Sequence, residues 1–310
     1  MDALLPLALP ALTAAWTAWR SRAIERAHPP EGNFVDTRAG RIHVLDRGYG
    51  KTPVVFLHGA SSNLRTWEPA IGYGLGNLGR TILLDRPGHG FSERIAGRGA
   101  ASLEHQAGAV IDVLDELGID QAVMVAHSWA GALGARLGLD HPDRVAGLVM
   151  LAPVTHPWPG GVSWYYEVAA RPVIGELFTW TLTLPVGEMW MQQGMKSVFA
   201  PQSIPEAYQD RAAIPLVLRP HQFRANAEDC ASLLAEVTAQ APRYGEISCP
   251  MTVISGTDDA VVWTHLHSHG LKADVPHTKL ILLDGIGHAP HHAKPELVLT
   301  EVASMLAEVA

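Results

Sequence analysis

The chain has 310 residues, of which 47% are hydrophobic and 17% are charged, so it can form a large folded core and lacks the composition of a disordered protein. Its formal net charge is -8 and its 23 lysines and arginines form no basic run, which argues against nucleic acid as a partner. Two cysteines, Cys230 and Cys249, are too few for a disulfide framework and favour a reducing, cytoplasmic compartment.

Residues 1–30 are predicted to form an apolar helical segment that precedes the main fold. The run from Ala3 to Trp19 is uncharged, and a cluster of arginines follows it. No positive charge precedes the run and no small-residue cleavage site follows it, so a cleaved secretory signal is not expected. Pro6 and Pro10 are expected to interrupt its first part. Two roles stay open for residues 3–19: peripheral contact with a membrane, or packing on the protein body or on a second subunit of a homo-oligomer.

Seven short apolar runs follow Phe34 and are predicted to be strands. Most of them are continuously apolar rather than alternating, which is typical of parallel strands that are buried on both faces. The first is the second of two short strands in NFVDTRAGRIHVLDRG, which form a hairpin that turns at Ala39 and Gly40, so the sheet is expected to be mixed. The predicted strands are residues 41–46, 54–59, 81–85, 122–128, 145–151, 251–255 and 279–285.

Helical segments alternate with these strands, and this alternation predicts an α/β fold with a mostly parallel, doubly wound sheet. Helices are expected from Ser102 to Leu117, with Ser102 as the cap, from Trp129 to Leu139 and from Lys294 to Val309.

The alternation stops after Pro153 and resumes near Pro250. The interval is rich in Trp, Met, Pro and Gly and has helical segments with irregular links. We therefore predict an inserted helical lid at residues 154–245, between two parts of one core at residues 31–153 and 246–310.

A serine stands where one predicted strand ends and the next helix begins, in the sequence AHSWAG. Small residues around such a serine are typical of a nucleophile that is held at a sharp turn, because only small residues let the strand and the helix pass so closely. Ala126 and Ala130 take the two small positions, in place of the glycines of a GxSxG motif.

Two further segments supply partners for a nucleophilic serine. GTDDAVV places Asp258 and Asp259 after one predicted strand, and GIGHAP places His288 after the next. An imidazole can take the proton of a serine hydroxyl, and a carboxylate can hold that imidazole in the correct tautomer. The order serine, aspartate, histidine along the chain matches one of the known arrangements of this triad.

From about Gly32 to its C-terminus the chain resembles the α/β-hydrolase fold superfamily, in particular its serine esterase and lipase-like members. The triad turns carry this resemblance, together with FLHGASS, similar to a His-Gly oxyanion loop, and LLDRPGHGFSER, similar to a DxxGxGxS segment. The resemblance implies that Ser128 is the nucleophile, His288 the base and Asp259 the orienting acid, with Asp258 as the alternative acid.

The resemblance also implies that the backbone N–H groups of Ala60 and Trp129 form an oxyanion hole and that His58 braces the loop. The polar residues Asp85, Arg86, His89 and Ser92 are expected to be structural, with a carboxylate that ties the glycine-rich turn by hydrogen bonds.

These residues predict a serine hydrolase that cleaves carboxylic esters of small to medium apolar acyl chains through an acyl-enzyme. Other chemistries of the same triad stay open: a lactonase, a carbon–carbon bond hydrolase, a perhydrolase or an acyltransferase. A non-catalytic ligand-binding receptor is the alternative from another class. A serine at position 128 argues against a haloalkane dehalogenase or an epoxide hydrolase, which would have an aspartate there.

Apolar residues of the lid are candidates for a substrate pocket, although packing within the lid accounts for many of them as well. The candidates are Trp158, Trp164, Phe178, Trp190 and Met195. The 16 histidines complete no recognisable metal-ligand spacing with Cys, Asp or Glu, so no metal site is predicted, and the resemblance implies no cofactor.

Overall fold

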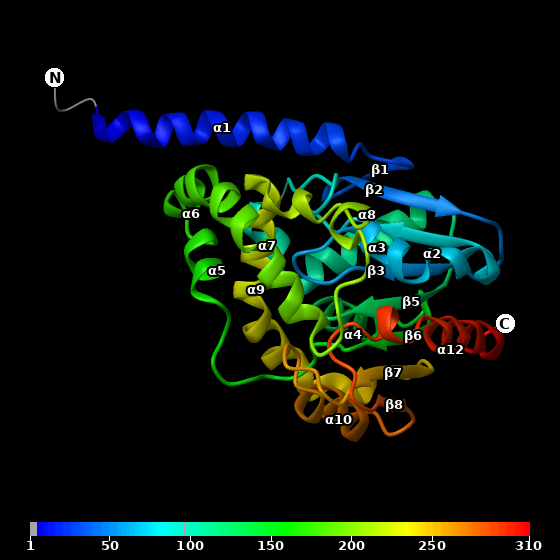
Figure 1. The fold of residues 1–310 in the computed structure, drawn as a ribbon. Helices are drawn as coiled ribbons and strands as arrows, with labels where there is room; N and C mark the ends of the chain where they lie inside the picture. The colour runs from blue at the N-terminus through cyan, green and yellow to red at the C-terminus, as the bar shows by residue number, and fades with distance from the viewer. Residues whose placement is uncertain (1–4, 96) are drawn as a thin grey trace.

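The computed structural model describes residues 5–95 and 97–310, which contain one sheet of eight strands with helices on both faces (Figure 1). The strands follow the order β1-β2-β4-β3-β5-β6-β7-β8. β1 pairs with β2 and β2 with β4 in antiparallel fashion, and every pairing from β4 to β8 is parallel. The predicted hairpin and the mixed, mostly parallel sheet are therefore confirmed. The strands are β1 (Asn33–Thr37), β2 (Gly40–Arg47), β3 (Val54–Leu57), β4 (Thr81–Leu84), β5 (Ala122–His127), β6 (Val145–Leu151), β7 (Met251–Gly256) and β8 (Lys279–Leu283).

Two hydrophobic layers enclose the sheet, because neighbouring residues of a strand point to opposite faces. In β5, Met124 and Ala126 pack in the layer that contains α3 and α4, whereas Val123 and Val125 pack in the layer that contains α2 and α12. Both faces of the central strands are buried, which is why their sequences are continuously apolar. The helices around the sheet are α2 (Glu68–Leu75), α3 (Leu103–Glu116), α4 (Ala130–Asp140), α10 (Thr264–Asp274), α11 (Pro290–Ala293) and α12 (Pro295–Glu308).

The helices predicted near residues 102–117, 129–139 and 294–309 are confirmed as α3, α4 and α12. α3 begins where the sequence indicated, because the hydroxyl of Ser102 accepts the N–H of His105 at 3.1 Å and so satisfies one free donor of the first turn.

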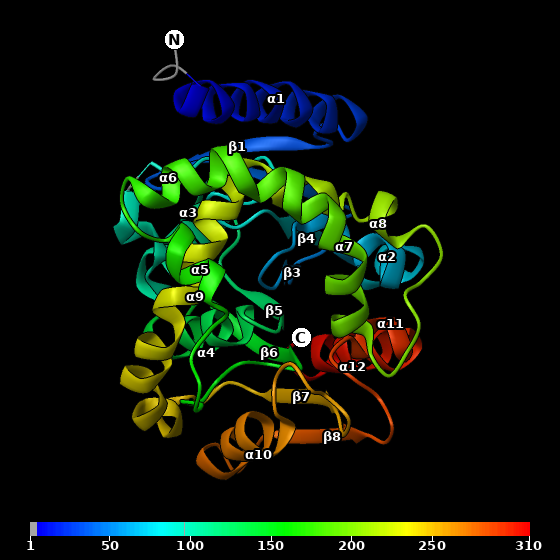
Figure 2. The ribbon, with the colours of Figure 1, turned by 60° about the vertical axis from the view of Figure 1, so that its left-hand side comes forward.

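A group of helices stands between β6 and β7 in the chain, which confirms the inserted helical lid. Figures 1 and 2 show these helices gathered at one end of the sheet, with α9 running back toward β7. The proposed domain limits at residues 153 and 246 stay a prediction. The inserted helices are α5 (Trp164–Ala169), α6 (Ile174–Phe178), a π-helical turn at Thr179–Thr183, α7 (Leu184–Phe199), α8 (Tyr208–Arg211) and α9 (Pro220–Gln240).

Helix α1 (Leu5–Ala27) lies along the outside of α6 and α7 in both views. It runs through Pro10 without a break, so the predicted interruption is wrong; near an exposed helix start, water can satisfy the carbonyl that a proline leaves free. Residues 3 and 4 of the predicted membrane-contact segment lie outside the described residues. Over the described ranges, no helix combines the length and the apolar character needed to cross a membrane.

Candidate active site

The turn after β5 places Ser128 at the carboxyl end of the sheet in a strained backbone conformation. Its φ is 57°, a value that residues other than glycine rarely adopt. Neighbouring segments pass very close to this turn. A Cβ on Gly131 would lie 2.3 Å from Cβ of Pro153, and a Cβ on Gly59 would lie 3.1 Å from Cβ of Ser128. The small residues of the AHSWAG segment and its surroundings therefore allow this close packing.

Three turns bring the predicted triad residues together at this edge of the sheet. The hydroxyl of Ser128 and Nε2 of His288 are 2.8 Å apart, and Nδ1 of His288 is 2.8 Å from Oδ2 of Asp259. Asp259 and His288 are both buried. The other carboxylate oxygen of Asp259 accepts the backbone N–H groups of Val261 and Val262, each at 2.8 Å, so the carboxylate is held in place from both ends. The three side chains form one continuous hydrogen-bonded chain that ends at the serine oxygen.

Two backbone N–H groups beside Ser128 are available as donors. Trp129 follows Ser128 directly, and Ala60 follows Gly59, the residue that packs against Ser128. Within the described residues neither N–H group donates a hydrogen bond, so both can bind an oxygen that carries negative charge.

The lid contributes residues to this site that the sequence did not indicate. Asn226 of α9 accepts the N–H of Ser61 through Oδ1 at 2.5 Å, and its amide nitrogen donates to the Ser61 hydroxyl at 3.0 Å. The hydroxyl of Tyr166 on α5 lies 2.9 Å from the same Ser61 oxygen, and burial raises the pKa of Tyr166. Ser61 has a φ of 49° and stands next to Ala60. The lid therefore holds the loop that carries one of the two free N–H groups.

Arg86 links the loop that carries Ala60 to the turn that carries Ser128. Its side chain is fully buried and donates to the carbonyl oxygen of His58 at 3.0 Å and to that of Gly59 at 3.2 Å. It also pairs with Asp229 of α9 at 2.7 Å, and its guanidinium lies 3.9 Å from the ring centre of Trp129. His58 in turn accepts the backbone N–H of Arg86 at 3.0 Å, which agrees with its expected bracing role.

Two other imidazoles lie near His288, those of the half-buried His127 and the buried His291. Nε2 of His127 lies 3.0 Å from the backbone carbonyl oxygen of His288, and the His291 ring centre is 4.5 Å from that of His127. Burial lowers the pKa of His127 to about 3, and it holds the pKa of His291 well below its ordinary value. Both rings are therefore neutral near pH 7, so they do not oppose a positive charge that forms on His288.

The five candidate pocket residues do not gather at one place. Trp158 packs at the edge of the core under the lid, and Met195 packs with Phe199 near Ala289, the residue after His288. Phe178 lies 6.4 Å from Trp164 between ring centres, and Trp164 is 67% exposed. Trp190 is 65% exposed. A role in substrate contact stays a prediction for all five.

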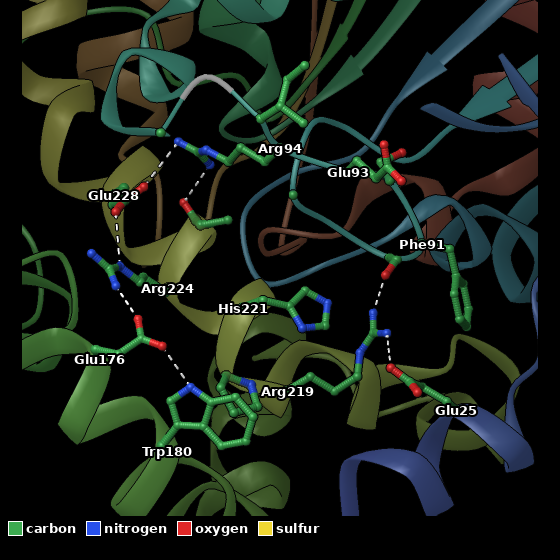
Figure 3. Close-up of a pocket in the computed structure, with 17 residues that line it drawn as sticks. Glu25, Phe91, Glu93, Arg94, Glu176, Trp180, Arg219, His221, Arg224 and Glu228 are labelled. Atoms are coloured by element: carbon green, nitrogen blue, oxygen red, sulfur yellow. Dashed lines mark hydrogen bonds and ion pairs between the residues drawn. The ribbon is translucent and has the colours of Figure 1, made fainter. Parts of the chain in front are cut away.

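A cavity of about 650 Å³ lies apart from the triad, between the loop after β4, the start of α9 and the π-helical turn (Figure 3). Each arginine and glutamate that lines it takes part in an ion pair. Arg219 pairs with Glu25 at 2.8 Å, and Arg224 pairs with Glu228 at 3.2 Å. No triad residue lines this cavity.

Several known proteins are similar to this chain in sequence or in fold. Residues 52–295 match the family model of the alpha/beta hydrolase fold. The 2-hydroxy-6-oxononadienedioate/2-hydroxy-6-oxononatrienedioate hydrolase of Cupriavidus pinatubonensis is 28% identical over 268 residues, which cover 82% of this chain and 88% of that protein. The acetyltransferase component of an acetoin cleaving system from Cupriavidus necator is 35% identical over 126 residues, or 39% of this chain, and the match spans only 32% of that protein. The structure of a thermophilic esterase from Thermogutta terrifontis is similar with a TM-score of 0.71 at 21% identity, covering 90% of this chain and 99% of that chain.

The family model covers most of the chain, from the residues just before β3 to the start of α12. It includes the strained serine turn after β5 and the turns that carry the aspartate and the histidine. Because the family model matches residues 52–295 and the sheet has the mixed, mostly parallel topology described above, the chain belongs to the α/β-hydrolase fold family and is a hydrolase of that fold.

Proposed function

We propose that this protein is a serine esterase that cleaves carboxylic esters with small to medium apolar acyl chains. The observation that carries the proposal is the chain of two 2.8 Å contacts from Ser128 through His288 to Asp259. In such an arrangement the imidazole takes the serine proton while the serine oxygen attacks an ester carbonyl carbon, and the carboxylate stabilises the imidazolium that forms.

The reaction proceeds in two halves. Attack by Ser128 forms a tetrahedral oxyanion, which the N–H groups of Ala60 and Trp129 bind. The carbon–oxygen bond to the alcohol breaks, the alcohol leaves with the proton from His288, and an acyl-enzyme remains. Water then gives a proton to His288 and attacks the acyl carbon, after which the acid is released and Ser128 regains its proton.

The preference for an uncharged acyl group is supported by the charges near the site. Arg86 is the buried cation behind the oxyanion loop, and it pairs with Asp229. Arg94 pairs with the same carboxylate at 2.9 Å. Glu228 lies 3.5 Å from Arg94 and supplies a second carboxylate, so both cations are paired within the protein and do not offer a binding partner to a carboxylate on the substrate.

Carbon–carbon bond hydrolysis is the second candidate, because the Cupriavidus pinatubonensis relative bears the name of a nonadienedioate hydrolase and matches 82% of this chain. Its named substrate is a dicarboxylate, whereas the esterase proposal calls for an apolar acyl group. Lactone hydrolysis, perhydrolysis and acyl transfer would share the first half-reaction, in which Ser128 is acylated. A lactonase would differ in acting on a cyclic ester, and the other two reactions would differ in the molecule that accepts the acyl group.

A panel of p-nitrophenyl esters of increasing chain length tests the proposal, with a 2-hydroxy-6-oxo dienedioate assayed in parallel. We expect turnover with a chain-length optimum on the esters and much slower cleavage of the dienedioate. The reverse order would establish the carbon–carbon bond hydrolase, and ligand binding without turnover of either would indicate a receptor.

Replacing Ser128 tests the mechanism. Ser128→Ala is expected to lower kcat by about five to six orders of magnitude without loss of folding, because the hydroxyl itself forms the acyl-enzyme. A fluorophosphonate should label the parent protein and not this variant. Ser197→Ala, at an exposed lid serine, is the matched control and should keep parent activity and labelling. Parent-like hydrolysis by the Ser128 variant would exclude the serine mechanism.

A further inference from the structure

The exposed apolar side chains of this protein are concentrated on one part of its surface. Among the described residues, 20 large hydrophobic side chains are exposed; four of them lie on α1 and nine within residues 164–190 of the lid, although these two segments are short. We call this set the apolar face. Its members are Leu9, Leu12, Trp16, Trp19, Trp164, Val173, Ile174, Leu177, Trp180, Leu182, Val186, Met189 and Trp190.

Most of the large apolar side chains described on α1 are exposed to water. Thr17 and Ile24 are buried on its inner side, whereas Leu9 and Leu12 are each 67% exposed. A helix normally buries the stripe with its largest apolar residues, because that burial provides the stabilisation. The outer stripe of α1 therefore lacks a partner among the residues that the structure describes, and an apolar surface of this kind marks an interaction site.

The two segments form one surface. Nε of Arg20 on α1 bonds to Oε1 of Glu188 on α7 at 2.7 Å, and α1 packs against residues 179–183. Trp16 lies one helical turn before Arg20, and Met189 directly follows Glu188, so exposed apolar side chains flank this ion pair on both helices. Figures 1 and 2 show α1 beside α6 and α7 from both directions.

The unpaired charged side chains around the apolar face are mostly positive, whereas the net charge of the whole chain is -8. The acidic residues of α1, α6 and α7, at positions 25, 176 and 188, are each paired with an arginine. Within the described part of the chain, four exposed cations and one exposed anion on α1 and α5 to α7 make no ion pair. The cations are Arg22, Arg26, Arg171 and Lys196, and the anion is Glu167. The face therefore combines apolar side chains with a surplus of positive charge.

We propose that the apolar face docks on the surface of an anionic lipid bilayer, with α1 and the lid helices lying in the plane of the headgroups. Five of its members are tryptophans, the side chains that favour the boundary between headgroups and acyl chains. Apolar insertion together with basic residues is the combination that gives stable peripheral binding to anionic lipids. The lid would then face the bilayer, so that an apolar ester dissolved in lipid reaches the site from that side; this last step rests on the proposed function.

Vesicle sedimentation of the full chain tests the docking. The probes are vesicles of phosphatidylcholine alone and of an equal mixture of phosphatidylcholine and phosphatidylglycerol. We expect binding to the mixed vesicles that weakens with added salt. Two pairs of substitutions, Trp16→Gln with Trp19→Gln on α1 and Val186→Gln with Met189→Gln on α7, should each lower the partition coefficient about tenfold or more, because each removes two apolar side chains from the face.

Further variants separate charge and surface location. Arg22→Gln with Arg26→Gln should weaken binding about tenfold on the mixed vesicles and little on phosphatidylcholine alone. Tyr49→Gln removes a side chain that is 95% exposed in the turn after β2, outside the apolar face, and should bind as the parent does. All variants should keep the parent's far-UV circular dichroism spectrum and its midpoint of urea unfolding, which shows that they are folded.

Three outcomes would overturn the proposal. The first is parent binding no stronger than that of the α1 and α7 variants, and the second is a loss of binding confined to the α1 pair. The third is an unchanged partition accompanied by a smaller oligomer in light scattering, which would make the face a contact between copies of this chain. Vesicle binding is measured without turnover, so its failure is distinct from a failure of the proposed esterase activity.

Discussion

Two adjacent aspartates follow β7, and the backbone turns only one of them toward His288. Asp259 is buried and its two oxygens are engaged by His288 and by the N–H groups of Val261 and Val262. Asp258 is exposed, and its carboxylate accepts the hydroxyl of the neighbouring Thr257 at 3.0 Å. The turn after β7 exposes the side chain of Asp258 and buries that of Asp259, so the two positions are not interchangeable.

We therefore expect Asp259→Asn and Asp258→Asn to differ strongly on one ester substrate. The amide at position 259 keeps the shape but favours the wrong imidazole tautomer, which should lower kcat by up to about four orders of magnitude. The same change at position 258 should leave kcat within about threefold of the parent, because surface substitutions away from the site have small effects. Steady-state kinetics with circular dichroism on both variants provides the measurement. A dead Asp258 variant beside an active Asp259 variant would refute this assignment.

Arg86 joins four elements that are distant in the sequence. It follows β4, donates to the loop after β3, stacks on Trp129 at the start of α4 and pairs with Asp229 on α9. Burial lowers the pKa of this guanidinium, although the adjacent Asp229 carboxylate opposes that effect. One N–H donor next to Ser128 belongs to Trp129, on which Arg86 stacks. The other belongs to Ala60, which follows Gly59, and Arg86 donates to the carbonyl oxygen of Gly59. We therefore infer that Arg86 is a positioning residue for the oxyanion hole.

Arg86→Lys tests this inference, since lysine keeps the charge but loses the planar fork and the stacking. We expect kcat to fall by more than about tenfold with little change in KM, because the oxyanion donors act mainly in the transition state. Arg86→Met, which leaves a buried carboxylate with fewer partners, should lower the free energy of unfolding by about 3 kcal/mol or more. Arg243→Lys changes a half-exposed ion pair with Asp140 and serves as the control, with an expected effect below about 1 kcal/mol. A rise in KM with kcat unchanged would contradict the positioning role.

At the scale of the whole molecule, the fold contains several imidazoles that are kept neutral by burial. Burial lowers the pKa of His127 to about 3 and the pKa values of His267 and His292 each to about 4. In the unfolded chain these groups take up protons near pH 6.5. Between these pH values the unfolded state therefore binds more protons than the folded state. The stabilisation is fully present above about pH 6.5 and is lost as the pH falls toward 4.

The free energy of unfolding should consequently decrease steadily when the pH is lowered from about 7 to about 4.5, as measured by urea titration at several pH values. His292→Gln should flatten this dependence, because it removes one of the groups that titrate only on unfolding. His277→Gln, at an exposed position, should leave the slope as in the parent. Stability that is constant over this range would show that the folded protein accepts protons on these imidazoles.

The sequence by itself determined the alternation of strands and helices along the chain, the inserted lid and the turn that carries Ser128. These features depend on local properties that a sequence displays directly: continuous apolar runs for strands buried on both faces, a serine cap before α3, and small residues where β5 meets α4. The positions of the aspartates and of His288 followed in the same way, because each stands directly after an apolar strand.

Only the tertiary structure decided which side chains from distant segments meet. The contact of Asn226 with Ser61 joins residues 165 positions apart, and the pair of Arg86 with Asp229 spans 143 positions. Such contacts depend on how the lid packs on the core, and the periodicity of a helix indicates which of its faces is apolar but not which distant segment that face meets. For the same reason the sequence did not distinguish the buried Met195 from the exposed Trp190, since both are large apolar residues whose burial is set by neighbours elsewhere in the chain.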